Sequence, residues 1–233
     1  MPRSRRAVLF DLDDTLYPRR RFVLSGFAAV ARHLDRQYQS GAAGVYRVLC
    51  DAYRHGGRGR ELQIALRHFD LPPVLLPGLI ALMRSHRPSL RLPASSRHAL
   101  GRIPPGWRVG IVTNGLPSVQ VNKVRGLGLD AIVDDVVYAC EHGTRTGKPD
   151  VAPFLVALAR LGVPPHQAVF VGDDEACDVR GAAAAGLRTI RVVRSEPAAS
   201  VADATVRSVA DVPELLNQLD GRLELEVWSR DVA

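Results

Sequence analysis

The spacing of apolar and polar positions changes along the chain and divides it into regions. After about residue 95, short segments rich in β-branched residues alternate with helical patterns, which is typical of a parallel sheet with crossover helices. A similar apolar segment stands near the start of the chain. The pattern predicts an α/β fold whose strands lie at residues 7–11, 108–112, 132–137, 168–171 and 189–193.

The stretch DVAPFLVALARLG, residues 150–162, predicts one of the crossover helices. Asp150 is suited to cap the N-terminus of this helix, and Gly162 stands just past its end. Apolar residues recur at helical spacing, and we expect them on one face: Val151, Phe154, Leu155, Leu158 and Leu161.

Residues 18–92 interrupt the alternation with helix-like stretches, such as Phe22–Gln37 and Glu61–Phe69, and with no clear strand. We therefore expect an all-helical domain at 18–92, inserted into a core domain formed by residues 1–17 and 93–233. From Gly221 onward, apolar and charged residues alternate, which predicts an edge strand or a loosely held end.

The composition is that of a soluble globular protein, with 46% hydrophobic and 24% charged residues among 233. The chain has no uncharged apolar run near the roughly 20 residues that a membrane helix needs. The first apolar segment ends at Asp11, too early for a signal peptide. We expect a cytoplasmic protein with no membrane partner and with reduced cysteines, because the three cysteines are widely spaced.

The net charge of +7 raises the question of a nucleic-acid partner. All but two of the 31 basic residues are arginines, and they are scattered beside abundant Ala, Gly and Pro. No nucleic-acid-binding motif accompanies them, so a nucleic-acid partner is not expected. In such a chain the two lysines, Lys123 and Lys148, stand out as positions that need a lysine.

Polar and acidic residues cluster after the predicted strands, where ligands bind in an open α/β sheet. Carboxylates that converge there would repel one another unless a cation held them, and Mg²⁺ prefers such oxygen ligands. A lysine and a hydroxyl nearby would complete a site for transferring a phosphoryl group. The clusters are Asp11, Asp13, Asp14 and Thr15; Thr113 and Asn114; Lys148; and Asp173, Asp174 and Asp178.

The motifs DLDDTL, TNG, GKPD and GDDEACDV occur in this order, and with them the chain resembles the haloacid dehalogenase superfamily. The similar branch is subfamily I, which has a helical C1-type cap after the first strand. The resemblance covers nearly the whole chain and implies a doubly wound, Rossmann-like core with an inserted helical cap. It also implies a Mg²⁺-dependent phosphomonoesterase that forms an aspartyl-phosphate intermediate on a small soluble phosphate ester.

The resemblance assigns roles to the first three motifs. Asp11 matches the nucleophile and Asp13 the general acid and base. Their spacing fits, because side chains two apart in an extended segment point the same way. Thr113, with the backbone around Asn114, matches the phosphate-binding group. Lys148 matches the lysine that steadies charge on the nucleophile and the phosphoryl group.

The last motif supplies the expected metal site. Asp173 matches the acid that binds Mg²⁺ together with Asp11 and the backbone carbonyl of Asp13. Asp178 matches a second acid nearer the edge of that site. For Asp174 two interpretations stay open, a contact with a metal-bound water or a cap on the following helix.

Several other residues of these motifs have simpler interpretations. Asp14 is interpreted as a turn or capping residue, and the run Arg19–Arg21 as solvated charge. Cys177 lies in the last motif, but no histidine is recognisably placed to activate it. The seven histidines form no cluster with metal-ligand spacing, so zinc is not expected.

The aspartate at position 13 favours phosphate esters over the dehalogenase and phosphonatase chemistries of the superfamily. A nucleoside 5′-monophosphate is the first substrate that we expect, because FDLDDTLYP followed by TNG is similar to nucleotidase-like relatives. Sugar phosphates and phosphoglycolate-like acids are alternatives. A sugar phosphomutase and a non-catalytic binding protein on the same fold also stay open, and the sequence does not indicate an oligomeric state.

Overall fold

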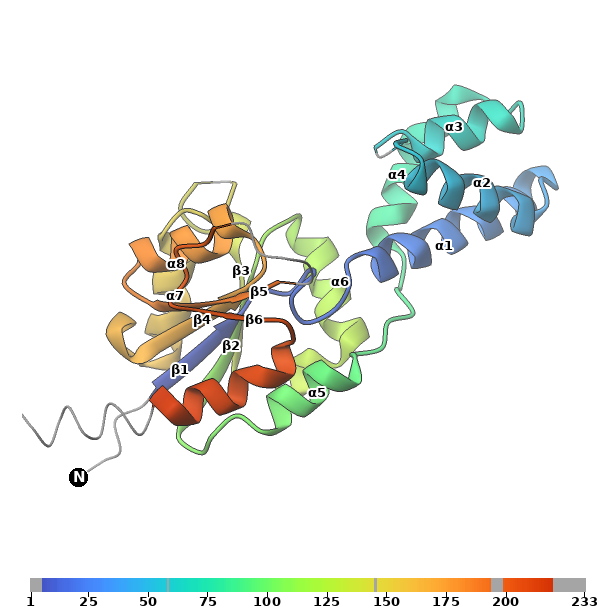
Figure 1. Cartoon of the computed structure of the whole chain (residues 1–233). Coiled ribbons are helices and arrows are strands. Elements are labelled where there is room, and N and C mark those ends of the chain that lie inside the picture. The colour runs from blue at the N-terminus through green and yellow to red at the C-terminus, as the bar shows by residue number, and fades with distance from the viewer. Residues whose placement is uncertain (1–5, 58, 145, 194–198, 220–233) are drawn as a thin grey trace, which may run out of the picture. The chain divides into compact units, whose positions relative to one another are not determined.

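The computed structural model describes residues 6–57, 59–144, 146–193 and 199–219 (Figure 1). The chain divides into two compact units, of which one comprises Met1–Pro18, Leu92–Gln120 and Gly128–Ala233. The other comprises Arg19–Arg91 and Val121–Leu127. The edge strand considered from Gly221 onward lies outside the described residues.

The first unit is built on a six-stranded sheet in the order β3-β2-β1-β4-β5-β6, and all of its strand pairs are parallel. The strand order changes direction at β1, so the carboxyl end of β1 lies at a topological switch point. This confirms the predicted α/β, Rossmann-like fold. The strands are β1 (Arg6–Phe10), β2 (Trp107–Thr113), β3 (Asp135–Tyr138), β4 (Ala168–Gly172), β5 (Arg188–Val192) and β6 (Ala204–Val206).

Two features of the sheet differ from the sequence prediction. The third strand begins at Asp135 and not at Ile132, because Leu129–Ala131 forms a 3₁₀ turn and the Ile132 side chain is exposed. The sixth strand, β6, was not predicted. It has three residues, which is too short to show an alternating pattern.

Helices cover both faces of the sheet, with α7 and α8 on one face and α5 and a last helix at 212–219 on the other (Figure 1). On the α7 face, Leu9 of β1, Phe154 of α7 and Phe170 of β4 belong to one buried cluster. The helices are α5 (Ala94–Gly101), α6 (Pro117–Leu127), α7 (Ala152–Leu161) and α8 (Gly181–Ala184), with a π-helical turn at Glu175–Arg180 and 3₁₀ turns at Leu129–Ala131, Ala139–Glu141, Pro165–Gln167 and Val209–Asp211.

Helix α7 is the crossover helix predicted at 151–161, and it ends as expected at Gly162, which has φ of +68°. The side chain of Asp150 accepts a hydrogen bond from the Ala152 N–H at 2.9 Å, so it caps the first turn. The predicted apolar face is wrong in two places, because Val151 and Leu155 are exposed. Only a narrow stripe of the helix packs on the sheet. Its buried residues are Pro153, Phe154, Ala157, Leu158 and Leu161.

The described residues of the second unit form helices joined by turns and short loops, with no strand among them, and they have their own apolar core. The helices predicted at 22–37 and 61–69 correspond to α1 and α3. Among the helices described in either unit, none combines the length and the apolar character needed to cross a bilayer. The helices of the second unit are α1 (Arg20–Tyr38), α2 (Ala42–Arg54), α3 (Glu61–His68) and α4 (Leu76–Ser85), with a 3₁₀ turn at Pro73–Leu75.

Candidate active site

The site begins where β1 ends. Phe10 is the last residue of the strand, and the Asp11 N–H donates to the carbonyl oxygen of Val171 on β4 at 2.9 Å. This bond extends the ladder by one residue and fixes the backbone of Asp11 at the switch point. The side chain of Asp11 is almost completely buried.

The next residues leave the strand in a tight turn. Asp14 has φ of +63°, and its N–H donates to the Tyr17 carbonyl at 2.8 Å, so Asp14 is a turn residue, as the sequence indicated. Leu12 is buried. Asp11 and Asp13 do not lie in the regular extended segment that was assumed, because Leu12 is in a turn and Asp13 forms an isolated bridge with Tyr17. The Asp13 carboxylate is nevertheless near enough to contribute to the raised pKa of Asp11.

Lys148 is the buried cation of the site. Its Nζ lies 2.6 Å from Asp11 Oδ1 and 2.7 Å from Asp178 Oδ1, and it donates to the Val112 carbonyl at 2.9 Å. These three acceptors match the three hydrogens of an ammonium group. Lys148 thus ties the ends of β1 and β2 to the π-helical turn after β4. The two carboxylates raise the pKa of Lys148 and outweigh burial, which alone would lower it, so the group is charged.

Asn114 holds the backbone of Lys148 and not its ammonium. The Asn114 Nδ2 donates to the Lys148 carbonyl at 2.8 Å, and Asn114 Oδ1 accepts from the Lys148 N–H at 2.8 Å. The amide of Asn114 therefore satisfies both backbone polar groups of the residue that carries the charge. The Lys148–Pro149 peptide bond is cis.

Thr113 and Asp13 are linked through one glutamine. Gln120, on α6, donates from Nε2 to Asp13 Oδ2 at 3.1 Å and also to Thr113 Oγ1. The other oxygen of Asp13, Oδ1, accepts from the Tyr17 hydroxyl at 2.7 Å. Both Asp13 carboxylate oxygens thus accept a hydrogen bond from a side chain of the first unit.

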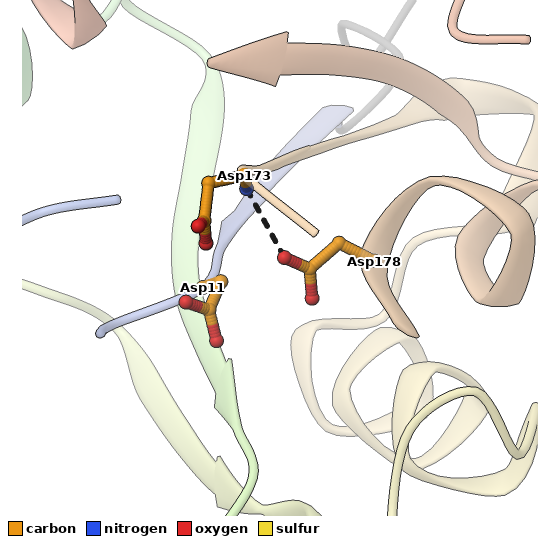
Figure 2. Close-up of side chains that lie close together, drawn as sticks. All are labelled: Asp11, Asp173 and Asp178. Carbon is orange, nitrogen blue, oxygen red and sulfur yellow. Dashed lines mark hydrogen bonds between the residues drawn. The ribbon is translucent and has the colours of Figure 1, made fainter. Parts of the chain in front are cut away.

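The last motif forms the third side of the site, after β4. The buried Asp178 accepts at Oδ2 from the N–H groups of Asp173 and Asp174, each at 3.1 Å. Figure 2 shows the first of these bonds, with the Asp11 and Asp173 carboxylates beside each other. Asp174 Oδ1 accepts from the N–H groups of Ala176 and Cys177. Of the two interpretations of Asp174, the structure supports the helix cap.

An ion pair behind the site holds the loop that carries Asp173. Arg191 on β5 donates to the Asp173 carbonyl at 3.2 Å and to Glu175 Oε2 at 3.1 Å. Glu175 also accepts from the Ser200 hydroxyl at 2.7 Å. Hydrogen bonds, above all the one from Ser200, lower the pKa of Glu175. The loop is therefore anchored to the neighbouring strand.

The electrostatics of the site are unfavourable without a cation. Burial raises the pKa of Asp11 to about 8, although Lys148 acts in the opposite direction and Asp178 adds to the rise. Burial, followed by repulsion from Asp178, raises the pKa of Asp173 to about 6. For Asp11, burial has the largest effect on the pKa, and together with the charges of Asp178 and Asp13 it outweighs the ion pair with Lys148.

The same residues fit a divalent cation. Asp11, Asp173 and Asp178 each offer an oxygen, and these oxygens lie within 4.8 Å of one another, close to the span of two metal–oxygen bonds of about 2.0–2.6 Å. With the charge of Lys148 included, the ionised cluster carries a net charge of −2. Both oxygens of Asp178 already accept hydrogen bonds, so Asp11 and Asp173 are better suited to hold an ion directly.

Two further predictions concern the cysteine of the last motif and the arginine run after the first motif. Burial raises the pKa of the Cys177 thiol, so it has little thiolate character, in agreement with its rejection as a nucleophile. Arg19, Arg20 and Arg21 are exposed, as a solvated charge run would be.

The sequence analysis missed Gln120 and gave Tyr17 no role at the site. A signal for Gln120 was present, because it stands four and seven residues before the apolar Val124 and Leu127 and so shares their face on a helix. A buried polar side chain needs a hydrogen-bond partner. No comparable pattern marked Tyr17, because its partner depends on the turn after Asp11.

Known proteins resemble this chain in sequence and in fold. A family model described as haloacid dehalogenase-like hydrolase matches residues 5–186. The glyceraldehyde 3-phosphate phosphatase of Methanopyrus kandleri is 30% identical over 246 residues, covering 98% of this chain and 98% of the relative. The ribulose-1,5-bisphosphate 5-phosphatase of Halopiger xanaduensis is 31% identical, over 82% of this chain and 85% of its own length.

Among solved structures, a HAD phosphatase from Thermococcus onnurineus superimposes on this chain with a TM-score of 0.59 and 25% identity. The match covers 91% of this chain and 97% of that protein. The similarity therefore extends over both units of the chain and not only over the sheet.

Proposed function

Because the chain belongs to the haloacid dehalogenase-like hydrolases and is a phosphatase of that family, we propose that it hydrolyses small phosphorylated sugars in a Mg²⁺-dependent reaction. The observation that carries the reaction is the ion pair between Lys148 and Asp11, 2.6 Å apart at the end of β1. It holds a buried carboxylate beside a cation, at the place where ligands bind in a parallel sheet. The relatives named for a triose phosphate and a pentose bisphosphate suggest the substrate class.

In this proposal Asp11 is the nucleophile. One of its oxygens bonds to phosphorus while the bond from phosphorus to the ester oxygen breaks, and the product is an aspartyl phosphate. Asp13 gives a proton to the departing alcohol. Asp13 then takes a proton from a water molecule, which attacks the phosphorus of the aspartyl phosphate. Inorganic phosphate leaves, and Asp11 is restored.

The surrounding residues stabilise charge in these steps. Thr113 and the backbone around Asn114 bind the phosphate oxygens, and Lys148 offsets the charge on Asp11. Mg²⁺, when bound, offsets the negative charge of the phosphate and of the acidic cluster. Asp11, Asp173 and the backbone carbonyl of Asp13 would hold it, while Asp178 anchors Lys148 and the backbone of Asp173.

The helical unit serves, in this proposal, as the cap that selects the leaving group, and the reaction takes place in the cytoplasm. The nucleoside 5′-monophosphate expected from the sequence remains a prediction, and it is the second substrate class in the test. Phosphoglycolate-like acids are the third.

The test is phosphate release from triose, pentose and hexose phosphates, nucleoside 5′-monophosphates and phosphoglycolate, with Mg²⁺ and then with EDTA. We expect Mg²⁺-dependent release that is fastest with a sugar phosphate and is abolished by Asp11→Asn. If phosphate were released faster from nucleotides than from sugar phosphates, nucleotides would be the substrate class and the proposed mechanism would be unchanged.

Two other outcomes would overturn the mechanism. Phosphate that moves between positions of a hexose phosphate without being released would identify a mutase. No turnover of any ester by the folded, Mg²⁺-supplied protein would favour a binding role.

A further inference from the structure

Gln120 is a buried polar residue to which the proposed chemistry gives no role. It is 1% exposed, on the first turns of α6, seven residues after Thr113. A buried amide is costly unless its polar atoms are hydrogen-bonded. Both hydrogen bonds from its Nε2 go to residues of the proposed machinery, Asp13 and Thr113.

The chemistry of the two partners fixes the direction of these bonds. An ionised carboxylate accepts hydrogen bonds and donates none, so the atom that faces Asp13 Oδ2 is the NH₂ group of Gln120. The same nitrogen has a second hydrogen, which goes to Thr113 Oγ1. A hydroxyl that accepts this bond keeps its own hydrogen for donation. Gln120 thereby leaves the Thr113 hydroxyl free to donate, and it occupies one lone pair of Asp13 Oδ2 while the carboxyl group keeps others for the proton that it carries as an acid.

The amide of Gln120 is also held in place. Gly115 has φ of +122°, and a Cβ at this position would lie 3.3 Å from Gln120 Cδ, so the backbone after Asn114 packs directly on the amide. On the other side of Asp13, the Tyr17 hydroxyl donates to Oδ1 at 2.7 Å. The two donors act on different oxygens and so fix the rotation of the carboxyl group.

We infer that Gln120 is a positioning residue that sets the orientation of Asp13 as general acid and, through the same nitrogen, directs the Thr113 hydroxyl toward the phosphate. The inference rests on the proposed function. The effect through Asp13 appears in kcat/KM, which reports the steps up to departure of the alcohol, and there a misplaced acid harms only esters whose alcohol needs a proton to depart.

The experiment compares kcat/KM for two esters, the best alkyl phosphate of the panel and p-nitrophenyl phosphate, whose leaving group departs without a proton. Gln120→Met keeps the approximate shape and removes both donors. We expect it to lower kcat/KM for the alkyl ester by roughly 10- to 100-fold, part of the 10²–10⁴ that general acids contribute. It should lower kcat/KM for p-nitrophenyl phosphate far less, by the part that the Thr113 hydroxyl contributes to phosphate binding.

A double-mutant cycle separates positioning from general damage. Asp13→Asn should show the same selective loss to a greater extent, and Gln120→Met added to Asp13→Asn should lower alkyl ester hydrolysis little further. Gln120→Leu is a second variant that also removes both donors, and it should show the same selectivity if Gln120→Met does not fold. Gln37→Met, on the exposed end of α1, is the matched control and should leave both rates unchanged.

Equal losses for the two esters, or losses that add fully to those of Asp13→Asn, would overturn the positioning role while leaving the proposed function intact. A wild-type protein that hydrolyses neither ester, or an Asp11→Asn variant that remains active, would instead overturn the proposed function and the positioning role with it.

Discussion

Gly172, the last residue of β4, lies directly against the side chain of Asp178, so that a Cβ at position 172 would overlap Asp178. Asp178 has little freedom to move away, because it is buried and accepts hydrogen bonds from Lys148 and from the backbone after β4. The acidic cluster therefore requires glycine at position 172.

Gly172→Ala should therefore displace Asp178. We expect a loss of about 1–3 kcal/mol in the free energy of unfolding from overpacking, and a fall in kcat of about 10²-fold from the misplaced Asp173 and Lys148. Urea unfolding and steady-state kinetics measure the two effects. Gly101→Ala in α5 is the control, because a Cβ there meets nothing within 4 Å. Wild-type activity in Gly172→Ala would contradict the close packing.

Lys148→Met should leave Asp11 and Asp178 buried without their cation. Removing one partner of a buried pair costs about 3–5 kcal/mol, and loss of an electrostatic stabiliser lowers kcat by about 10²–10³. The double variant Lys148→Met with Asp178→Asn should regain part of the stability and none of the activity. Urea unfolding in EDTA and phosphate-release assays give the two quantities, and near-normal turnover in Lys148→Met would refute the role of the ammonium.

Mg²⁺ should stabilise the protein more at pH 8 than at pH 5. Burial raises the pKa of Asp11 to about 8 and that of Asp173 to about 6, from 3.8, in the metal-free protein. A carboxyl whose pKa is raised on folding loses its contribution to stability as the pH rises from the unfolded toward the folded value. A cation binds the ionised form, so protons compete with it at low pH.

Thermal unfolding with Mg²⁺ and with EDTA at both pH values measures this difference. Asp173→Asn, which removes one proposed ligand, should reduce the Mg²⁺-dependent rise in Tm. An equal rise at both pH values, or a larger one at pH 5, would contradict the assignment.

Asp174→Ala should cost about 0.5–2 kcal/mol of stability, because it removes the side chain that caps the turn at Glu175–Arg180. Asp174→Ser should retain most of that stability, since serine is also a good cap, and should keep the wild-type Mg²⁺ dependence. If Asp174→Ser instead required much more Mg²⁺ for the same rate, a contact with a metal-bound water would be the better interpretation.

The sequence could predict the sheet and the positions of its reactive ends, because apolar strands buried on both faces leave a strong local pattern. It predicted β1 and β4 closely for this reason. It placed the start of the third strand wrongly at Ile132, since an apolar residue in a turn resembles the first residue of a strand. The three residues of β6 left no pattern at all.

The contacts within the site depend on tertiary structure and could not be predicted in the same way. Whether Asp174 caps a helix is decided by the backbone after β4, and the bond from Gln120 to Asp13 joins segments that are far apart in the sequence. The motifs predicted residues that the structure brings together at the end of β1. They gave no sign that one glutamine would join Thr113 to Asp13.

The bonds between Asn114 and the backbone of Lys148 make the position of residue 148 independent of its side chain. Asn114 pairs with an N–H and a carbonyl that any residue except proline supplies at that place. A substitution at residue 148 therefore removes the ion pairs of the side chain and leaves these two backbone hydrogen bonds available. The charge at this point of the sheet and the anchoring of the backbone that carries it are thus supplied by different groups.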